Sequence, residues 1–337
     1  MNGGAGVVIG ATLMFVTSAA LGAQAVSPQC TVTPAVAGSA LDICRKAADL
    51  FAFVVPQVGV ALSGGNPVLG EGGTLGGWGK RSVTFRVTAV DGRLPVKSVP
   101  LTLQRSGAVG DDFGADRAPV PMASIDAAIG VLTGIPVGVT NVGGVDLLVG
   151  ATAVPTVKKG SFDLEPDGRG IAFSYGARIG LLQESSFVPG ISVSYLRRAL
   201  PSMDANSTTT NDTVQVRNVS LTSQALRLVA SKRFVFIGLA AGIGQDKITG
   251  NADLSAVVNE PLLGTSQRVA ITFPTLRESV TRNTAFVNAS LGLSAARLVV
   301  EIGRSNAGTV RETLNTFDGR RANEAYTYGS AGLTVRF

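Results

Sequence analysis

The sequence predicts an all-β fold, an antiparallel up-and-down β-barrel of about ten strands preceded by one helix. Three observations predict this fold. From residue 81 onward, apolar residues recur at every second position, which is typical of strands with one apolar face. The connections between these strands alternate between long and short. Charged residues make up only 15% of the 337 residues and glycines number 42, yet no long helical run dominates the chain.

Ten segments carry the two-residue period. In the first of them, Val83, Phe85 and Val87 share one face, and the pattern returns up to the end of the chain. In residues 213–231 the period changes phase near Leu226, which predicts a β-bulge at that point. The ten predicted strands are residues 81–91, 121–133, 143–154, 169–183, 187–198, 213–231, 233–247, 279–295, 297–305 and 325–337.

The connections between these strands indicate a barrel that crosses a membrane. Transmembrane barrels have long loops outside, short turns on the periplasmic side and an even number of strands, so both ends of the chain would lie in the periplasm. Twelve strands is the nearest alternative count, because residues 252–258 or 267–273 could add two spanning strands or a hairpin above the membrane. A water-soluble β-protein stays open as an alternative, although it would need no such alternation.

The first 25 residues predict a secretory signal peptide. An apolar run over residues 7–16 leads to Ala23-Gln24-Ala25, a small-residue pattern that signal peptidase accepts. The run is short for a helix that spans a bilayer, and glycine and threonine interrupt it. We therefore expect the mature chain to be exported.

The last predicted strand ends on an aromatic residue. Phe337, Val335 and Leu333 share one face of it, and Arg336 lies on the other. An alternating last strand with a terminal aromatic resembles the signature of bacterial outer-membrane β-barrels, by which the assembly machinery recognises them. The resemblance implies a place in the outer membrane, with lipids, lipopolysaccharide and the barrel assembly machinery as partners. An ordinary amphipathic strand that happens to finish in Phe is the alternative.

One helix is predicted before the barrel. Apolar residues recur at helical spacing over residues 39–55, Ser39 is a candidate N-cap, and Pro56 is expected to end the helix. Residues 62–80 are so rich in glycine that we expect a loop or closely packed backbone, and they match no phosphate-binding motif. The predicted division is a signal peptide (1–25), a periplasmic helix with a glycine-rich plug that enters the barrel from the periplasmic side (26–80), and the transmembrane barrel (81–337).

A second resemblance concerns the predicted plug. A helix rich in small residues, the pair Asn66-Pro67 and then the first barrel strand look like the N-terminal hatch of the long-chain fatty acid transporter (FadL and toluene-channel) family. The resemblance covers residues 39–91 and implies uptake of hydrophobic compounds through a barrel closed by its N-terminal hatch. It makes Asn66 and Pro67 candidate hatch residues, and a simple turn is the alternative.

If the apolar phase of the strands faces lipid, the opposite phase lines the lumen. Four charged residues of that phase come from four successive strands, so we expect a ladder of opposite charges across one wall. Charges in a partly dry lumen must pair or meet water. A polar path or ligand site and a salt-bridged filling of a narrow barrel both fit this pattern. The predicted lumen-lining residues are Arg86, Asp126, Asp146, Arg178, Asn288, Glu301 and Arg336.

The two cysteines, Cys30 and Cys44, flank the start of the predicted helix. Export would bring them into an oxidising compartment, where two nearby thiols usually form a disulfide. Such a bridge would contribute about 3 kcal/mol by chain entropy. Two buried free thiols are the alternative, and either arrangement is structural.

The composition argues against several classes of function. The chain has no histidine, which excludes a Ser/His/Asp hydrolase and imidazole metal sites, and two cysteines cannot form a thiolate metal cage. We expect no enzyme activity, metal or cofactor. The net charge of +6 comes from scattered basic residues, so we expect no nucleic-acid partner.

These observations predict an outer-membrane channel or uptake protein for small molecules, hydrophobic ones included, that is gated by the N-terminal plug. The alternative is a structural or surface-display barrel whose long extracellular loops bind a partner.

Overall fold

The computed structural model describes residues 29–30, 37–94, 109–117, 119–154, 157–159, 162–166, 170–208, 213–262, 265–293, 295–311 and 313–337. The predicted signal peptide lies outside these described residues.

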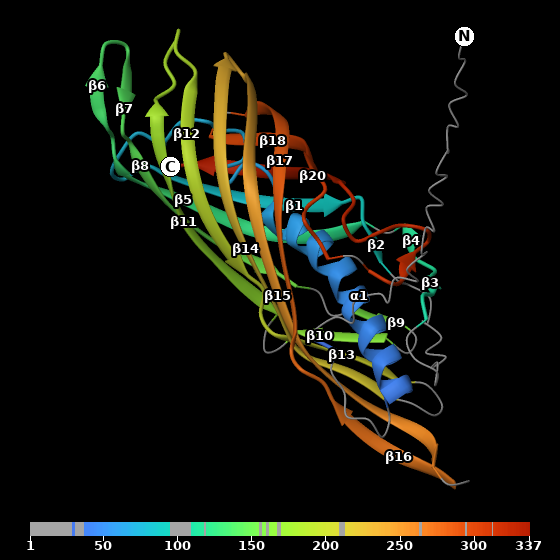
Figure 1. The fold of residues 1–337 in the computed structure, drawn as a ribbon. Helices are drawn as coiled ribbons and strands as arrows, with labels where there is room; N and C mark the ends of the chain where they lie inside the picture. Colours follow the sequence, from blue (N-terminus) through green and yellow to red (C-terminus); the bar gives the residue numbers. More distant parts are fainter. Residues whose placement is uncertain are drawn as a thin grey trace, which may run out of the picture.

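Ten antiparallel strands form a closed barrel, which confirms the predicted fold (Figure 1). Strands that follow one another around the barrel are paired, and the last strand pairs with the first. Phe337 completes this seam, because it exchanges two backbone hydrogen bonds of 3.0 and 3.2 Å with Arg81. The ten strands are β1 (Arg81–Val90), β5 (Val120–Leu132), β8 (Val145–Ala153), β11 (Ile171–Leu182), β12 (Gly190–Ala199), β14 (Thr213–Phe234), β15 (Ile237–Leu262), β17 (Leu276–Leu293), β18 (Ala296–Ser305) and β20 (Tyr326–Arg336).

The two ends of the barrel differ. We call the end where β1 begins and β20 ends the turn end, and the opposite end, which carries the long connections, the loop end. At the loop end β15 runs on through residues 252–258 and pairs with β16, so this region is a hairpin extension and ten strands close the barrel. The shorter strands are β2 (Arg93–Leu94), β3 (Asp112–Phe113), β4 (Asp116–Arg117), β6 (Ile135–Val137), β7 (Thr140–Val142), β9 (Val157–Lys159), β10 (Phe162–Pro166), β13 (Met203–Thr208), β16 (Thr265–Thr272) and β19 (Thr316–Phe317).

The predicted bulge near Leu226 is wrong. Leu226 is half-exposed between buried Ala225 and Arg227, so the strand alternates regularly there. The irregularity in β14 lies between Arg217 and Ser220. The apparent change of phase arises because apolar residues near the loop end face inward toward the helix, whereas those farther along the strand face outward.

The barrel reverses the usual distribution of polarity. Large apolar side chains stand on its outer face, and Phe173 is 72% exposed. Many of the side chains that the wall turns inward are polar or charged and buried. This distribution is typical of barrels whose outer face contacts lipid.

The helix α1 (Ala37–Ser63) continues past Pro56, where the sequence predicted its end. Proline removes one backbone hydrogen bond from a helix interior. Packing offsets this loss, because Val55 and Val60, on either side of the proline, belong to one apolar cluster with the barrel wall. The helix ends at Ser63, and the next residue, Gly64, has a φ of 57°, in the left-handed region that glycine adopts without strain.

The helix α1 lies inside the barrel wall and contacts strands on several sides (Figure 1). Its first half packs against Leu254 and Val258 of β15, at the loop end, and a helix of 27 residues is about 40 Å long. The segment that follows leads to Arg81 at the turn end. We expected the helix to enter from the periplasmic side, where the turn end would lie. It begins at the opposite end, because the 44 residues of 37–80 span the barrel's length instead of folding below it. Although α1 is long and apolar enough to cross a membrane, it is mostly buried in the protein.

Candidate functional site

All seven predicted lumen residues lie on the inward side of the wall. Six of them are buried, and the side chain of Arg336 is 35% exposed. The structure brings together Arg178 with Asp146, Arg86 with Asp126 and Asn288 with Glu301, and it places Arg336 beside the plug.

The predicted ladder of four charges is two separate clusters. Asp126 lies opposite Gly150 on the neighbouring strand, and Asp146 lies opposite Gly130. Along β8, Gly150 and Asp146 are four positions apart, so the two clusters lie at different heights in the barrel. Arg86 and Asp126 lie in the middle of the barrel, and Asp146 and Arg178 lie nearer the turn end.

The middle cluster caps the C-terminus of α1. Backbone carbonyls of residues 63–66 accept hydrogen bonds from Arg198 at 2.6 Å, from Arg227 at 3.0 and 3.1 Å, and from Arg86 at 2.5 Å. The last carbonyls of a helix have no partner within the helix and carry partial negative charge. Of these carbonyls, that of Ser63 is the last of the helix, and those of residues 64–66 belong to the turn that follows. The three buried guanidinium groups therefore hold both the end of the helix and this turn in place.

Carboxylates of the wall balance these arginines. Asp126 binds Arg198 at 3.0 Å and lies 3.7 Å from Arg86. Asp246 binds Arg227 at 2.6 Å. Each of the two acids is buried, so the ion pairs satisfy charges that would otherwise be strongly unfavourable in the lumen.

Asn66 and Pro67 lie in the centre of the lumen, where the chain turns after the helix. The backbone N–H of Asn66 donates to Glu301 at 3.0 Å, and its side-chain amide donates to the carbonyl of Glu71 at 2.9 Å. Its side-chain oxygen accepts from the N–H of Val68 at 3.2 Å. Asn66 thus joins the wall to the turn. The carbonyl of Pro67 accepts from Arg86 at 3.5 Å.

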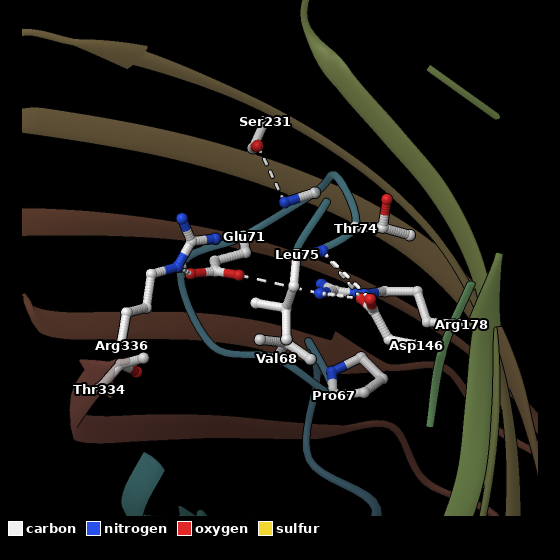
Figure 2. A network of polar contacts seen from close by, with 12 residues as sticks. Pro67, Val68, Glu71, Thr74, Leu75, Asp146, Arg178, Ser231, Thr334 and Arg336 are labelled. Atoms are coloured by element: carbon white, nitrogen blue, oxygen red, sulfur yellow. Dashed lines mark hydrogen bonds and ion pairs between the residues drawn. The ribbon is translucent and has the colours of Figure 1, made fainter. Parts of the chain in front are cut away.

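We call residues 64–80 the plug segment, and Glu71 is its central charge (Figure 2). Glu71 is 4% exposed and forms ion pairs with Arg336, with Arg297 at 3.3 Å and with Arg178 at 3.8 Å. Asp146 completes this group, because it binds the same nitrogen of Arg178, Nη2, at 2.7 Å. We call these five residues the Glu71 cluster.

Backbone contacts fix the rest of the plug segment. The N–H of Leu75 donates to both oxygens of Asp146 at 3.1 and 3.2 Å, and the N–H of Gly72 donates to Ser231 at 2.8 Å (Figure 2). A Cβ atom at Gly72 would lie 2.4 Å from the backbone nitrogen of Ser231. Only glycine lets the plug approach the wall this closely.

Loops cover α1 at the loop end. The rings of Phe53 and Phe317 stack with centroids 4.1 Å apart. Asp49 of the helix accepts backbone hydrogen bonds from Leu314 and Asn315 at 2.9 and 3.0 Å. The described lumen is therefore occupied by α1 at one end and by the plug segment at the other.

A short parallel pairing between β3 and β19 holds these loops together. The backbone N–H of Gly319 and the hydroxyl of Thr316 donate to Asp112 at 3.1 and 2.8 Å. These hydrogen bonds, that of Gly319 foremost, lower the pKa of the Asp112 carboxyl below its ordinary value. Asp112 is exposed, so these hydrogen bonds hold the two loops together at the surface of the protein.

Cys30 and Cys44 are joined by a disulfide that ties the chain before α1 to its second turn. Both residues are buried against Leu254 and Ile271, close to the loop end. The bridge lies far from the Glu71 cluster, and its role is to hold the start of α1 in place.

Several partners in these clusters are absent from the sequence-based prediction. Arg198 and Asp246 continue the inward phases of their strands, so a longer extrapolation of the period would have found them. Arg227 was hidden by the phase change assigned near Leu226. Arg297 has the same inward phase as Glu301 in the predicted strand 297–305, so the same counting would have found it. Glu71 lacks such a signal, since it lies in a glycine-rich segment with no period.

No cluster for a metal is present among the described residues: they hold no group of three His, Cys, Asp or Glu side chains arranged to bind one. The chemistry of the lumen is that of guanidinium groups with carboxylates and carbonyls.

No family model and no curated protein matches the chain. Its structure is similar to that of the outer membrane protease OmpT from Escherichia coli, at 12% identity over 77% of this chain and 96% of that one, with a TM-score of 0.38. It is also similar to the copper transporter OprC (13% identity, 78% and 43% covered, TM-score 0.30) and to an anion-selective porin from Comamonas acidovorans (9% identity, 77% and 98% covered, TM-score 0.18). These likenesses concern the barrel fold alone.

Proposed function

We propose that this protein is an outer-membrane β-barrel that takes up small molecules through a lumen closed by the plug segment. The apolar outer face and the polar lumen support a place in a membrane. Phe337 at the barrel seam supports recognition by the barrel assembly machinery. Outer-membrane lipids and lipopolysaccharide would surround the wall, with the loop end outside the cell.

This proposal rests on the observation that mainly polar contacts hold the plug segment in the lumen. Glu71, Asn66 and the backbone of Leu75 bind the wall through ion pairs and hydrogen bonds, and a small apolar cluster around Val68 adds to them. Polar groups can exchange such partners for water, and each hydrogen bond contributes a net of about 0.5–1.5 kcal/mol. A plug held by a large apolar interface would instead expose that area to water whenever it moved.

The charges of the lumen favour polar solutes. The resemblance to the fatty acid transporter family suggests hydrophobic solutes, yet guanidinium and carboxylate groups surround the plug segment at two levels. A hydrophobic molecule would have to displace these groups' partners without replacing them, which leaves charges unpaired. A polar solute can replace them.

An engineered disulfide tests whether the plug segment gates the barrel. A Cβ atom built on Gly180 of the wall lies 3.6 Å from the Cβ of Thr74 in the plug segment. Disulfides need about 3.5–4.5 Å between these atoms. We expect the double variant Thr74→Cys/Gly180→Cys to show no conductance in a planar bilayer when oxidised and to regain the wild-type level after reduction.

Two controls accompany this measurement. Wild-type protein treated with the same reductant accounts for reduction of the Cys30–Cys44 bridge. The single variant Thr74→Cys accounts for the loss of the threonine. Equal conductance of the oxidised and reduced double variant, with the new bridge verified by mass spectrometry, contradicts gating by the plug segment.

A second candidate function is a structural or surface-display barrel. It is favoured by the loop end, where β16, β15, β14, β13, β10 and β9 form a sheet that continues past the barrel and α1 is enclosed by loops. Such a rigid outer surface suits a binding partner at the cell surface. Absence of conductance and of solute uptake in the wild type, whether reduced or oxidised, would decide for this candidate.

A further inference from the structure

Three arginines of the wall form ion pairs with the single carboxylate of Glu71. Figure 2 shows two of them, Arg178 and Arg336. Arg178, Arg297 and Arg336 come from β11, β18 and β20. Oε1 of Glu71 pairs with Arg336 and, at 3.3 Å, with Arg297, while Oε2 faces Arg178 at 3.8 Å. Both oxygens of one carboxylate are therefore shared among three guanidinium groups.

The wall alone does not balance these charges. Among the described residues, Arg297 and Arg336 form ion pairs with Glu71 and with no residue of the wall, while Arg178 also binds Asp146. Without Glu71, Asp146 would be the one carboxylate in an ion pair with these three guanidinium groups among the described residues. Glu184 lies near Arg297 and Arg336 but forms its ion pair with Arg233. Like charges brought together in a partly buried site repel each other unless an anion is supplied. The wall at this level is thus built to hold an anion.

We propose that Arg178, Arg297 and Arg336 form a binding site for small carboxylate solutes, and that Glu71 is an internal ligand that occupies this site in the closed barrel. Guanidinium groups present planar pairs of N–H donors that match the two oxygens of a carboxylate. The present occupant is itself a carboxylate, so the site already has the dimensions of this group.

The site is open to solvent on one side. The side chain of Arg336 is 35% exposed and that of Arg297 is 12% exposed, whereas Arg178 and Glu71 are buried. A dissolved carboxylate can thus approach Arg336 and compete with Glu71. Only the consequence of this competition, release of the plug segment during uptake, depends on the proposed function. The binding site itself does not.

Chemical rescue tests the site without any measurement of transport. The variant Glu71→Ala removes the internal ligand, and its folded form is recognised by a shifted band on unboiled gels. Thermal unfolding in detergent is then compared in sodium acetate, sodium chloride and inorganic phosphate at equal ionic strength. At an acetate concentration ten times its Kd, binding would shift the unfolding equilibrium of Glu71→Ala about 11-fold toward the folded state. We expect this shift with acetate and none in the wild type, where Glu71 fills the site.

A matched control removes a different glutamate near the same end. Glu184 lies near Arg297 and Arg336 but forms its ion pair with Arg233, whose side chain is 40% exposed. In Glu184→Ala, Glu71 still occupies the three arginines, so this variant should not respond to acetate. The double variant Glu71→Ala/Arg297→Ala should lose the response of Glu71→Ala. If Glu71→Ala does not fold in chloride, its refolding yield in acetate becomes the measurement, and rescue supports the site.

Three results would overturn the proposal. The first is an acetate effect on Glu71→Ala no larger than that of chloride, on melting temperature or on refolding yield. The second is the same acetate effect in the wild type or in Glu184→Ala, which would show a general salt effect. The third is a stronger response to phosphate than to acetate, which would assign the site to phosphate-type anions. If acetate stabilises Glu71→Ala but the barrel never conducts, the carboxylate-binding site is supported and the proposed channel function is rejected.

Discussion

Asp146 of β8 and Arg178 of β11 lie directly opposite each other on neighbouring strands, and Arg178 donates two hydrogen bonds of 2.9 and 2.7 Å to one carboxylate oxygen of Asp146. Asp146 is completely buried and also accepts the backbone N–H of Leu75. One residue of the wall therefore holds both a strand pair and the plug segment.

Removing this carboxylate should destabilise the barrel. Asp146→Ala leaves Arg178 buried with the more distant Glu71 as its partner, and breaking a buried ion pair typically costs about 3–5 kcal/mol. We expect a loss of this size in the free energy of unfolding, measured by urea titration, and partial recovery in Asp146→Ala/Arg178→Ala. As a control, Glu324→Ala breaks the pair with Arg320, whose two side chains are 34% and 46% exposed, and should cost about 0–1 kcal/mol. Equal effects of the two single variants would mean that water fills the lumen.

Asp126→Ala tests the middle cluster separately. It leaves two buried arginines, Arg86 and Arg198, without their carboxylate, and we expect a loss of about 3–5 kcal/mol in the free energy of unfolding. Adding Arg86→Ala should recover part of this loss, because Arg198 still binds the carbonyl of Ser63. Unchanged stability together with altered conductance would indicate a hydrated path at this level and would count against a packed network.

The disulfide gives a prediction about thiol reactivity. If Cys30 and Cys44 are bridged, the protein unfolded in urea without reductant should take up no maleimide, and two labels should appear after reduction. Unfolding is needed because both residues are buried, so even free thiols would react slowly in the native protein. Replacing both by serine should cost about 3 kcal/mol in the free energy of unfolding. Two labels before reduction would reject the bridge.

The pairing of β3 with β19 should depend on pH. The pKa of Asp112 is lower in the folded protein than its ordinary value, because Gly319 and Thr316 donate hydrogen bonds to the carboxylate. The stabilisation is therefore present above the unfolded pKa of about 3.9 and is lost as the pH falls through the lower folded value. We expect faster hydrogen exchange in residues 109–117 in that acidic range. In Asp112→Asn the exchange should be fast already at neutral pH, and unchanged exchange at every pH would contradict the prediction.

Deletion of Phe337 should impair barrel assembly. The deletion removes two backbone hydrogen bonds to Arg81 at the seam together with the terminal aromatic side chain. We expect less heat-modifiable protein in outer-membrane fractions, and Phe337→Tyr should restore it because it keeps the aromatic ring and the backbone bonds. Full-length protein found soluble in periplasmic extracts would contradict the outer-membrane location.

The barrel wall was predictable because successive side chains of a strand face the outside and the lumen in turn, which makes apolar and polar residues alternate. Alternation of side chains fixes which residues face outward, so the phase containing Phe85 and Phe173 also assigned Arg86 and Arg178 to the lumen. The cross-strand pair of Asp146 and Arg178 followed from the same counting. The phase of β14 failed where apolar residues face the helix instead of lipid.

The contents of the lumen were less predictable. Glu71 acquires its role from three arginines that are more than 100 residues away in the sequence, and a segment without a period gives no orientation for its side chain. The continuation of α1 past Pro56 likewise depends on tertiary contacts of Val60 with the wall. The local sequence shows only that proline destabilises a helix interior, and it does not show the packing against the wall that outweighs this loss.

The direction of α1 has a consequence for the order of assembly. The chain before β1 starts at the loop end and joins the wall at the turn end, so a wall that closed first would have to let the bridged Cys30–Cys44 loop travel through its whole interior. The helix must therefore be in place before the seam between β1 and β20 forms. Among the described strands β20 comes last along the chain, and it pairs with β1. We therefore expect the wall to assemble around the helix, with the seam between β1 and β20 as the last strand pair to form.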